Sequence, residues 1–239
     1  MDIDGFWALI EESRAATTGP DDRAEWLTDK LAALPPRDIE DFQIHLDEQR
    51  RRVDSWLVWG AAYQILDGLC SDDGFFYFQA WLVGLGPETL SRVAEDPDNL
   101  ADVPEIRRLA GRSTDEWAED EWPDWEILDY VADTAHERRT GEEESLDDAL
   151  AERDHESPTD AEPEDDRWDF EDAGEVARRF PRLAAMFPLT DRAVRDARGK
   201  AAFDELLRER GQTEAEFFAE MEGQPTGTQD DSSPGSATS

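Results

Sequence analysis

The sequence predicts a mainly α-helical protein: a compact multi-helix globular domain around two buried aromatic-rich helices, with an acidic, partly disordered C-terminal extension. Apolar residues recur at helical spacing through the first 130 residues. Eight of the nine tryptophans lie between Trp7 and Trp125, which places one hydrophobic core in that part of the chain. Between positions 133 and 172 there are 18 acids, four bases and few apolar residues, a composition that favours a mobile segment.

Polar and proline residues mark where the first helices begin. Asp4 is expected to cap the first helix, and Asp22 with Glu25 has the spacing of a capping box that opens the second. Pro35 and Pro36 are expected to stop the second helix and start the third. The N-terminal part therefore reads as consecutive amphipathic helices.

The segment 56–66 is apolar on every helical face, which is typical of the central helix of a domain. Ser71, Asp72 and Asp73 are expected to cap a second apolar helix that ends at Gly86. A pair of strands is the alternative for such apolar runs, but their length and their caps favour helices.

The remaining chain divides by composition. We expect a helical core domain at 1–132, an acidic and partly disordered linker at 133–172, an apolar island with helices that docks on the core at 173–221, and a disordered tail at 222–239.

The formal charge of −37 limits the classes of partner. Residues 1–130 carry 31 acids and 11 bases, a net charge of −20, so the acidity is not confined to a tail. Such a field repels nucleic-acid phosphates and anionic lipids, so we expect neither direct nucleic-acid binding nor membrane binding. It favours a basic protein partner, while the oligomeric state stays open.

The chain is expected to be cytoplasmic. Cys70 is the single cysteine, so no intramolecular disulfide can form, which fits a reducing compartment. The first residues lack a basic region followed by an apolar one, and the longest apolar stretch, 56–63, is far shorter than the roughly 20 residues of a membrane helix.

Asp72 and Asp73, beside Cys70, form the most suggestive candidate site. Paired carboxylates at a helix start can perform general acid and base catalysis or bind one hard metal ion. The preferred interpretation is simpler, because capping and the helix dipole already explain acids at this position.

Cys70 could act as a nucleophile, since a helix N-terminus lowers a thiol pKa. The neighbouring carboxylates act in the opposite direction, and a buried structural cysteine is the preferred interpretation. His45, His136 and His155 show no spacing that suggests a catalytic dyad or a metal pair. We find no nucleotide, hydrolase or metalloprotease motif and expect no cofactor.

Two further clusters have a functional and a structural interpretation. Trp56, Trp59, Tyr63 and Trp81 could line an aromatic pocket, but at helical spacing aromatic residues more often form the core. The arginine run 50–52 could bind an acidic partner or a phosphate, or could complement the dipole at the end of the third helix.

The block from Trp59 to Trp81, WGAAYQILDGLCSDDGFFYFQAW, resembles the hallmark of a bacterial family called domain of unknown function 4240. Flanking segments are similar as well, among them Phe6-Trp7 and 33–36, and the resemblance covers roughly residues 1–130. It implies a compact helical domain in a cytosolic bacterial protein without an established activity. The sequence departs from the family pattern at Leu69, where a glycine is usual, and at Gln79, where an arginine is frequent.

Three functions are compatible with these features. The first is a non-enzymatic cytosolic protein-interaction module with an acidic surface. The alternative is a hydrolase or transferase that uses an Asp72/Asp73 carboxylate site, with or without a metal ion. The third, suggested by the charge alone, is a mimic of the phosphate backbone that occupies a DNA-binding protein.

Overall fold

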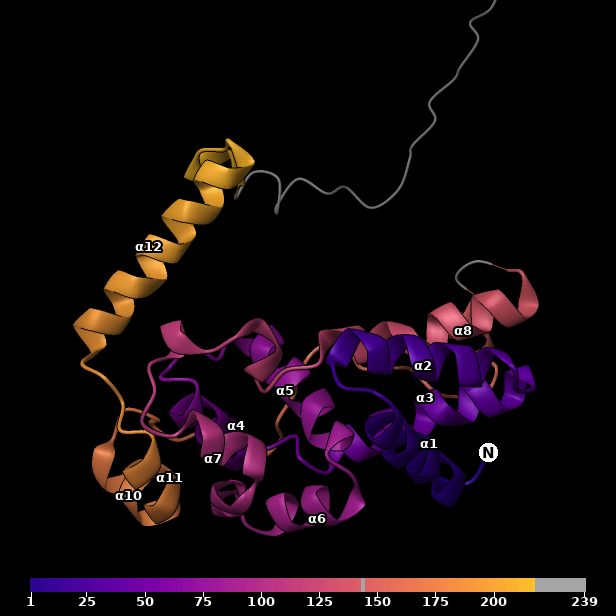
Figure 1. Ribbon diagram of the computed structural model, residues 1–239, viewed down its shortest axis with the longest axis horizontal. Helices are drawn as coiled ribbons and strands as arrows, with labels where there is room; N and C mark the ends of the chain where they lie inside the picture. The colour runs from indigo at the N-terminus through magenta and orange to yellow at the C-terminus, as the bar shows by residue number, and fades with distance from the viewer. Residues whose placement is uncertain (143–144, 218–239) are drawn as a thin grey trace, which may run out of the picture. The chain divides into compact units, whose positions relative to one another are not determined.

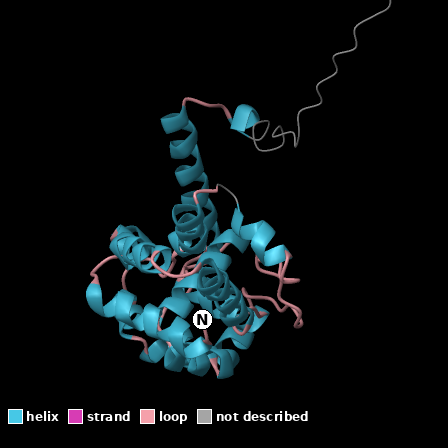
Figure 2. Cartoon of the chain, turned by 90° about the vertical axis from the view of Figure 1, so that its right-hand side faces the viewer, coloured by secondary structure: helices cyan, strands magenta, loops and turns pink. Residues whose placement is uncertain are grey.

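The computed structural model describes residues 1–142 and 145–217, and every regular element within them is a helix (Figure 2). The predicted mainly helical, compact multi-helix fold is therefore confirmed. The chain divides into two units, residues 1–190 and residues 191–239, which are described separately below.

The first unit consists of α-helices (Figure 1) and, between α6 and α8, short 3₁₀ helices that are numbered η1 to η4. Their bounds are α1 Ile3–Ala16, α2 Pro20–Ala32, α3 Pro36–Arg51, α4 Trp56–Ile65, α5 Asp72–Gly84, α6 Pro87–Glu95, η1 Pro97–Asp102, α7 Pro104–Leu109, η2 Thr114–Glu116, η3 Glu119–Glu121, η4 Glu126–Tyr130, α8 Val131–Thr140, α9 Ser145–Ala151, α10 Ala173–Arg179 and α11 Pro181–Met186. Six of them (α2, α3, α6, η1, α7 and α11) begin with a proline, whose fixed φ suits the first helical position and whose missing N–H is not needed there.

The predicted start of α3 at Pro36 is confirmed, but the predicted caps of α1 and α2 are wrong. Asp2, not Asp4, caps α1, because its Oδ1 accepts a hydrogen bond from the Gly5 amide at 2.9 Å. Helix α2 begins two residues before Asp22, and no side chain caps it. Asp4 and Asp22 instead lie in first turns, where their charge still suits the helix dipole.

The two helices expected at the centre of the core are α4 and α5, and both are largely buried. Residues on these helices that are at most 2% exposed include Val58, Ala61, Ala62, Ile65, Phe75, Phe78, Leu82 and Val83. The Trp59 ring stacks between Trp56 and Phe75, with centroid separations of 4.8 and 4.7 Å. This stack joins the two helices and supports the structural interpretation of the aromatic cluster.

The acidic segment after residue 132 contributes to the same unit. The expected domain boundary falls inside α8, which packs against α2 and α3 (Figure 1). Ala132 and Ala135 on α8 are fully buried, and Leu146 and Leu150 on α9 are 3% and 1% exposed. Within each of these two helices the apolar residues are three or four positions apart, so each mostly charged helix still presents one buried face.

The segment 153–168, which we call the strap, then runs back across α3 and α4 without forming a helix. Arg153 near its start donates to Glu40 Oε2 at 2.9 Å. Near its end, Asp165 Oδ1 accepts from the Trp56 amide at 2.7 Å, and Trp168 Nε1 donates to the Trp56 carbonyl at 3.1 Å. The partial disorder expected of residues 133–172 stays a prediction.

The apolar island also packs within the first unit. Val176, Phe180, Leu183 and Phe187 are all less than 10% exposed. Asp98 on η1, itself only 5% exposed, attaches this segment to the core. Its carboxylate accepts from the Leu183 amide at 3.0 Å and from Arg182 Nε at 3.1 Å.

The second unit contains α12 (Arg192–Arg210), which is longer than the helix expected around 201–210. The expected capping box after it is present, because the Glu216 amide donates to Thr213 Oγ1 at 3.3 Å and Glu216 Oε2 accepts from the Thr213 amide at 2.8 Å. The end of the helix expected behind this box and the expected disordered tail lie beyond residue 217, outside the described residues.

The contact between α4 and the strap requires a glycine at position 60. A Cβ atom added to Gly60 would lie 2.2 Å from Trp168 Cζ2. We expect Gly60→Ala to lower the free energy of unfolding by about 1–3 kcal/mol, because overpacking displaces the partly buried Trp168 ring. Urea denaturation followed by tryptophan fluorescence measures the change. The control is Gly74→Ala on α5, whose nearest contact would be an ordinary 3.4 Å; an equal loss there would contradict the steric explanation.

The buried Asp98 carboxylate gives a second prediction. Asp98→Asn replaces one acceptor oxygen by an NH₂ group that faces buried donors, so we expect the free energy of unfolding to fall by about 1–3 kcal/mol. Thermal and chemical denaturation measure it. Asp102→Asn is the matched control, because Asp102 pairs with the same Arg182 but is 49% exposed. Equal effects at both positions would show that the burial of Asp98 is unimportant.

Candidate functional site

The structure places Asp72 and Asp73 on the exposed first turn of α5. Ser71 caps this helix, since its Oγ accepts from the Gly74 amide at 3.1 Å. The two acids directly follow this capping residue and lie at the positive end of the helix dipole. Neither lines the groove or the pocket described below. Their placement matches the structural interpretation, and the catalytic one stays a prediction.

Cys70 is 8% exposed, and its burial raises the pKa of the thiol to about 12. At neutral pH the sulfur is therefore protonated, whereas the reactive form of a cysteine is the thiolate. The Trp59 indole donates to the Cys70 carbonyl at 3.3 Å, which ties this turn to α4. These surroundings are those of a structural cysteine.

One histidine forms a partly buried contact that spacing along the chain did not indicate. His155 Nε2 lies 2.7 Å from Asp47 Oδ2, although 108 positions separate the two residues. His45 instead contacts Glu48 on its own helix at 3.2 Å. Asp47 points into the core and is fully buried, while His45 lies on another face of α3, as their spacing predicts.

Asp47 belongs to a row of buried polar residues on α3. Gln43, Asp47 and Arg50 follow one another at spacings of four and three, so they lie on one face of the helix. They are 6%, 0% and 3% exposed. This cluster was not predicted from the sequence, although polar residues at core spacing could have revealed it, because buried polar groups need partners that the fold must supply.

The Asp47 carboxylate accepts three hydrogen bonds. Gln43 Nε2 donates to Oδ1 at 2.9 Å, and Oδ2 receives the Ser157 hydroxyl at 2.8 Å as well as the His155 contact. The serine hydroxyl bonds to the carboxylate rather than to the imidazole, so these residues do not have the arrangement of a catalytic triad. Burial nevertheless raises the pKa of Asp47 above its ordinary value, against the opposite effect of these donors.

Arg50 is the buried member of the arginine run. Its guanidinium lies 4.1 Å from the centroid of the Phe76 ring and donates to Asp129. Burial lowers the pKa of Arg50 to about 10, and none of the described residues accepts a hydrogen bond from its Nε. Arg51 is exposed and Arg52 donates to Ser91 Oγ at 2.9 Å, so the run does not form one basic patch.

A pocket of about 390 Å³, which we call the polar pocket, opens above this row. It lies between the end of α3, the turn before α4, the middle of α5, and the strap. Gln79 lines this pocket and is 1% exposed. It is the position at which the family resemblance leads one to expect an arginine. Its amide donates to Asp54 Oδ1 at 2.9 Å, so Gln79 interacts with Asp54 rather than with Asp72 or Asp73. Burial also raises the pKa of Asp54.

A larger hollow of about 790 Å³, which we call the acidic groove, lies between the start of α2 and residues 119–130. Six carboxylates line it: Asp21, Asp22, Glu119, Asp120, Asp124 and Glu126. Trp125, Ile127 and Tyr130 supply apolar surface, and the last two are 39% and 55% exposed. Although Asp124 reaches solvent, the surrounding protein and the charge of Glu126 raise its pKa.

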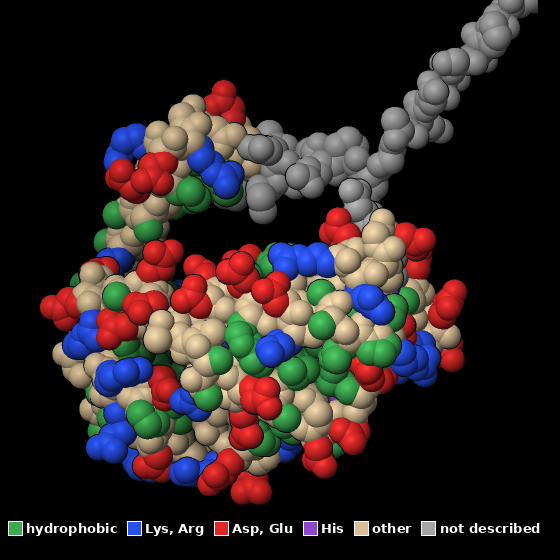
Figure 3. Space-filling model, turned by 45° about the vertical axis from the view of Figure 1, so that its right-hand side comes forward, with side chains coloured by type: hydrophobic (Ala, Val, Ile, Leu, Met, Phe, Trp, Pro, Cys, Tyr) green, Lys and Arg blue, Asp and Glu red, His purple; other side chains and the backbone are tan. Residues whose placement is uncertain are grey.

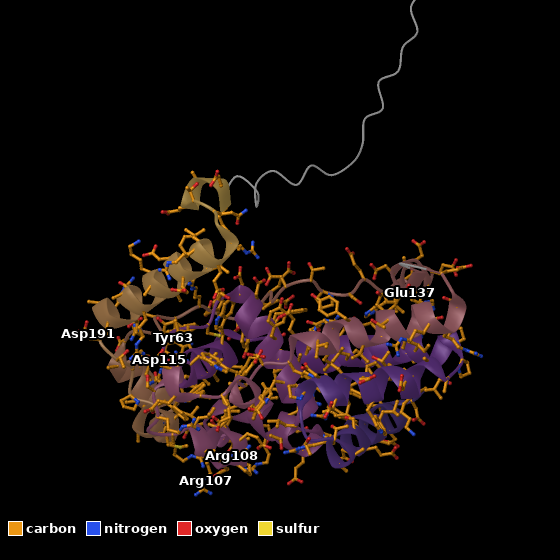
Figure 4. All side chains as sticks on the ribbon, turned by 45° about the horizontal axis from the view of Figure 1, so that its top comes forward. Tyr63, Arg107, Arg108, Asp115, Glu137 and Asp191 are labelled. Carbon is orange, nitrogen blue, oxygen red and sulfur yellow. The ribbon has the colours of Figure 1, made fainter. Side chains whose placement is uncertain are left out.

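Charges of both signs lie on the face of the molecule that Figure 3 shows. Figure 3 shows Asp and Glu side chains over the whole visible face, with Lys, Arg and apolar side chains between them. Arg107 and Arg108 lie at the outer edge of α7 (Figure 4).

Among the described residues, no group of three or more His, Cys, Asp and Glu side chains is arranged to hold a metal ion. None of the described helices combines the length and the apolar character that crossing a membrane requires.

Comparison with known proteins supports the resemblance noted above. Residues 1–138 match the family described as "Protein of unknown function (DUF4240)". The match covers more than half of the chain and includes α1 through most of α8, and with it the acidic groove and the α3 side of the polar pocket. No curated protein and no solved structure matches the chain. The chain therefore belongs to the DUF4240 family of proteins of unknown function.

Proposed function

We propose that the protein is a non-enzymatic cytoplasmic interaction module that binds a basic segment of a partner protein in the acidic groove. The observation that carries this proposal is the combination of six carboxylates with exposed Ile127 and Tyr130 around one hollow. Lysine and arginine side chains have an apolar stem and a charged tip, and they bury the stem while the tip meets opposite charge. The groove offers surface for both parts.

Electrostatics in the groove support a cationic occupant. The raised pKa of Asp124 arises partly from repulsion by Glu126, so an approaching positive charge relieves an unfavourable interaction. An anionic partner would add to that repulsion. The overall charge of −37 also accelerates the approach of basic partners.

The enzymatic alternative has less support. Asp72 and Asp73 are exposed and lie outside both hollows, and the buried Cys70 thiol is protonated at neutral pH. A hydrolase or transferase at that position would need surroundings that shift the pKa of its catalytic group and exclude water from it.

A matched pair of variants tests the groove. Asp21→Asn/Asp22→Asn removes two carboxylates at the start of α2, and Asp72→Asn/Asp73→Asn removes two at the start of α5. The probe is a synthetic 15-residue peptide of lysine and leucine, with a glutamate and leucine peptide as the negative control. We expect only the α2 variant to weaken binding, by about three- to tenfold, since each exposed pair contributes up to roughly 0.7 kcal/mol.

Isothermal titration calorimetry at low salt measures both affinities. If the two double variants lose affinity equally, the peptide responds to net charge and the groove is not the binding site. Absence of binding to the unmodified protein would also refute the proposal.

The raised pKa of Asp124 predicts a pH dependence. A bound cation favours the ionised carboxylate, so binding releases a proton wherever Asp124 is partly protonated. The affinity should therefore be constant at neutral pH and fall as the pH is lowered through the raised pKa, above the ordinary value of 3.8. Titrations at constant ionic strength measure this, and Asp124→Asn should flatten the upper part of the profile. An affinity that rises on acidification would contradict a cationic occupant.

A further inference from the structure

A hollow of about 250 Å³, which we call the tryptophan pocket, adjoins the acidic groove. The lining residues common to both are Gly19, Pro20, Glu119, Asp120, Asp124 and Trp125. Beyond this shared border, the tryptophan pocket is lined by Trp81, Leu85 and Trp122. Drug-sized ligands occupy pockets of roughly 300–1,000 Å³, so this smaller space suits one side chain of a partner that lies in the groove.

The aromatic walls of the tryptophan pocket are held in place by their neighbours. Trp81 and Trp122 are partly exposed, whereas Trp125 is only 3% exposed. The Trp122 ring meets the Trp117 ring edge-on with centroids 5.1 Å apart, and the Trp81 ring packs against Phe78 at 5.4 Å. Rings that are already fixed lose little conformational entropy when an apolar side chain packs against them.

Two guanidinium groups beside these rings are also fixed. Arg23 donates to Ser13 Oγ at 2.8 Å, and its guanidinium lies 4.3 Å from the centroid of the Trp125 ring. Arg14 donates to the Leu85 carbonyl at 3.1 Å. Burial and the nearby charge of Arg14 lower the pKa of Arg23 to about 10, so Arg23 is still positively charged at neutral pH. Because two like charges lie close together, the electron-rich face of an aromatic ring beside them is favoured.

The tryptophan pocket differs from the acidic groove in charge. Six carboxylates and no basic side chain are among the described residues that line the groove. In the tryptophan pocket, four carboxylates are nearly balanced by three arginines, Arg14, Arg23 and Arg108. One of these carboxylates, Glu105, accepts from Arg14 at 2.6 Å. A basic side chain therefore gains less here than in the groove and an acidic one still meets carboxylates, whereas an aromatic ring can contact both the tryptophans and the guanidinium groups.

We propose that the tryptophan pocket binds an aromatic side chain of the partner, next to the basic segment that lies in the acidic groove. This inference rests on the proposed function and narrows the partner to a basic segment with a tryptophan, tyrosine or phenylalanine at one end. Aromatic side chains that fill a pocket commonly dominate the binding free energy of an interface, while the charged contacts around them contribute less. The pocket therefore adds apolar selectivity to the charge selection of the groove.

The test uses the full-length chain, calorimetry at low salt and the lysine and leucine peptide as the reference. Related peptides carry tryptophan or glutamate in place of the first or the last leucine. We expect tryptophan at one of the two ends to tighten binding about fivefold or more, because the ring fills the pocket, and glutamate to weaken it. Equal affinities of the tryptophan and leucine peptides, or tightest binding by a glutamate peptide, overturn the inference.

Two variants test whether the peptide tryptophan lies in the pocket. Trp122→Ala removes one wall, and Thr18→Trp adds an indole at an exposed lining residue, where it competes for the same space. Neither position lines the acidic groove, so both variants should bind the reference peptide like the unmodified protein and lose most of the gain from tryptophan. Because Thr18 is exposed, its variant keeps the test decisive even if Trp122→Ala unfolds the chain.

The matched control for the added ring is Ala15→Trp, at an exposed position of α1 that lines neither hollow. Its gain from tryptophan should equal that of the unmodified protein. A gain that survives in Thr18→Trp, or an equal loss in Ala15→Trp, overturns the inference. If the reference peptide binds and tryptophan adds nothing, only this inference is refuted; if no peptide binds, the proposed function is refuted as well.

Discussion

The fold depends on one constraint: helix α4 has no face that water can solvate favourably. A helix that is apolar all round must be covered on every side, and its neighbours along the chain cannot do this alone. Helix α5 covers one side through the stacked rings of Trp59 and Phe75. Trp168, more than a hundred positions away, covers the side on which Gly60 leaves room for an indole ring. The chain must therefore return across α4, and the strap is that return.

The return of the strap also creates the polar pocket. Its carboxylates are brought against the end of α3, where Asp47 and Arg50 already face inward. His155 and Ser157 donate to Asp47 and so offset part of the cost of its burial. The requirement to bury an apolar helix and the requirement to pair a buried carboxylate are thus met by the same segment.

How much of this fold the sequence could predict depends on the kind of signal. Prolines at first helical positions and all-round apolar segments act locally, so the start of α3 and the central pair α4 and α5 were predictable. The apolar faces of α8 and α9 were not, because Ala132, Ala135, Leu146 and Leu150 are too sparse to stand out among charges. They are buried because α2 and α3 provide a surface for them, which is a property of the tertiary structure.

The candidate sites illustrate the same distinction. Asp72, Asp73 and Cys70 attracted attention because they are adjacent in the sequence, yet adjacency at a helix start is explained by capping. The partners Asp47 and His155 are brought together only by the strap, and no local pattern encodes that contact. The sequence does contain the spacing of Gln43, Asp47 and Arg50 along one face of the third helix, a signal from which no buried polar site was predicted and which does not identify their partners.

The acidic groove and the polar pocket differ in how strongly water screens the charges that line them. The groove carboxylates are open to solvent and counter-ions, so each one alone contributes little to the binding free energy. Discrimination among basic partners must therefore come from the apolar surface of Ile127 and Tyr130. The residues at the floor of the polar pocket are buried, so water screens the charges of Asp47 and Arg50 less. A chain with a net charge of −37 attracts cations everywhere on its surface. Selective recognition of a basic partner therefore requires what the surface charge lacks, namely apolar contact in the groove.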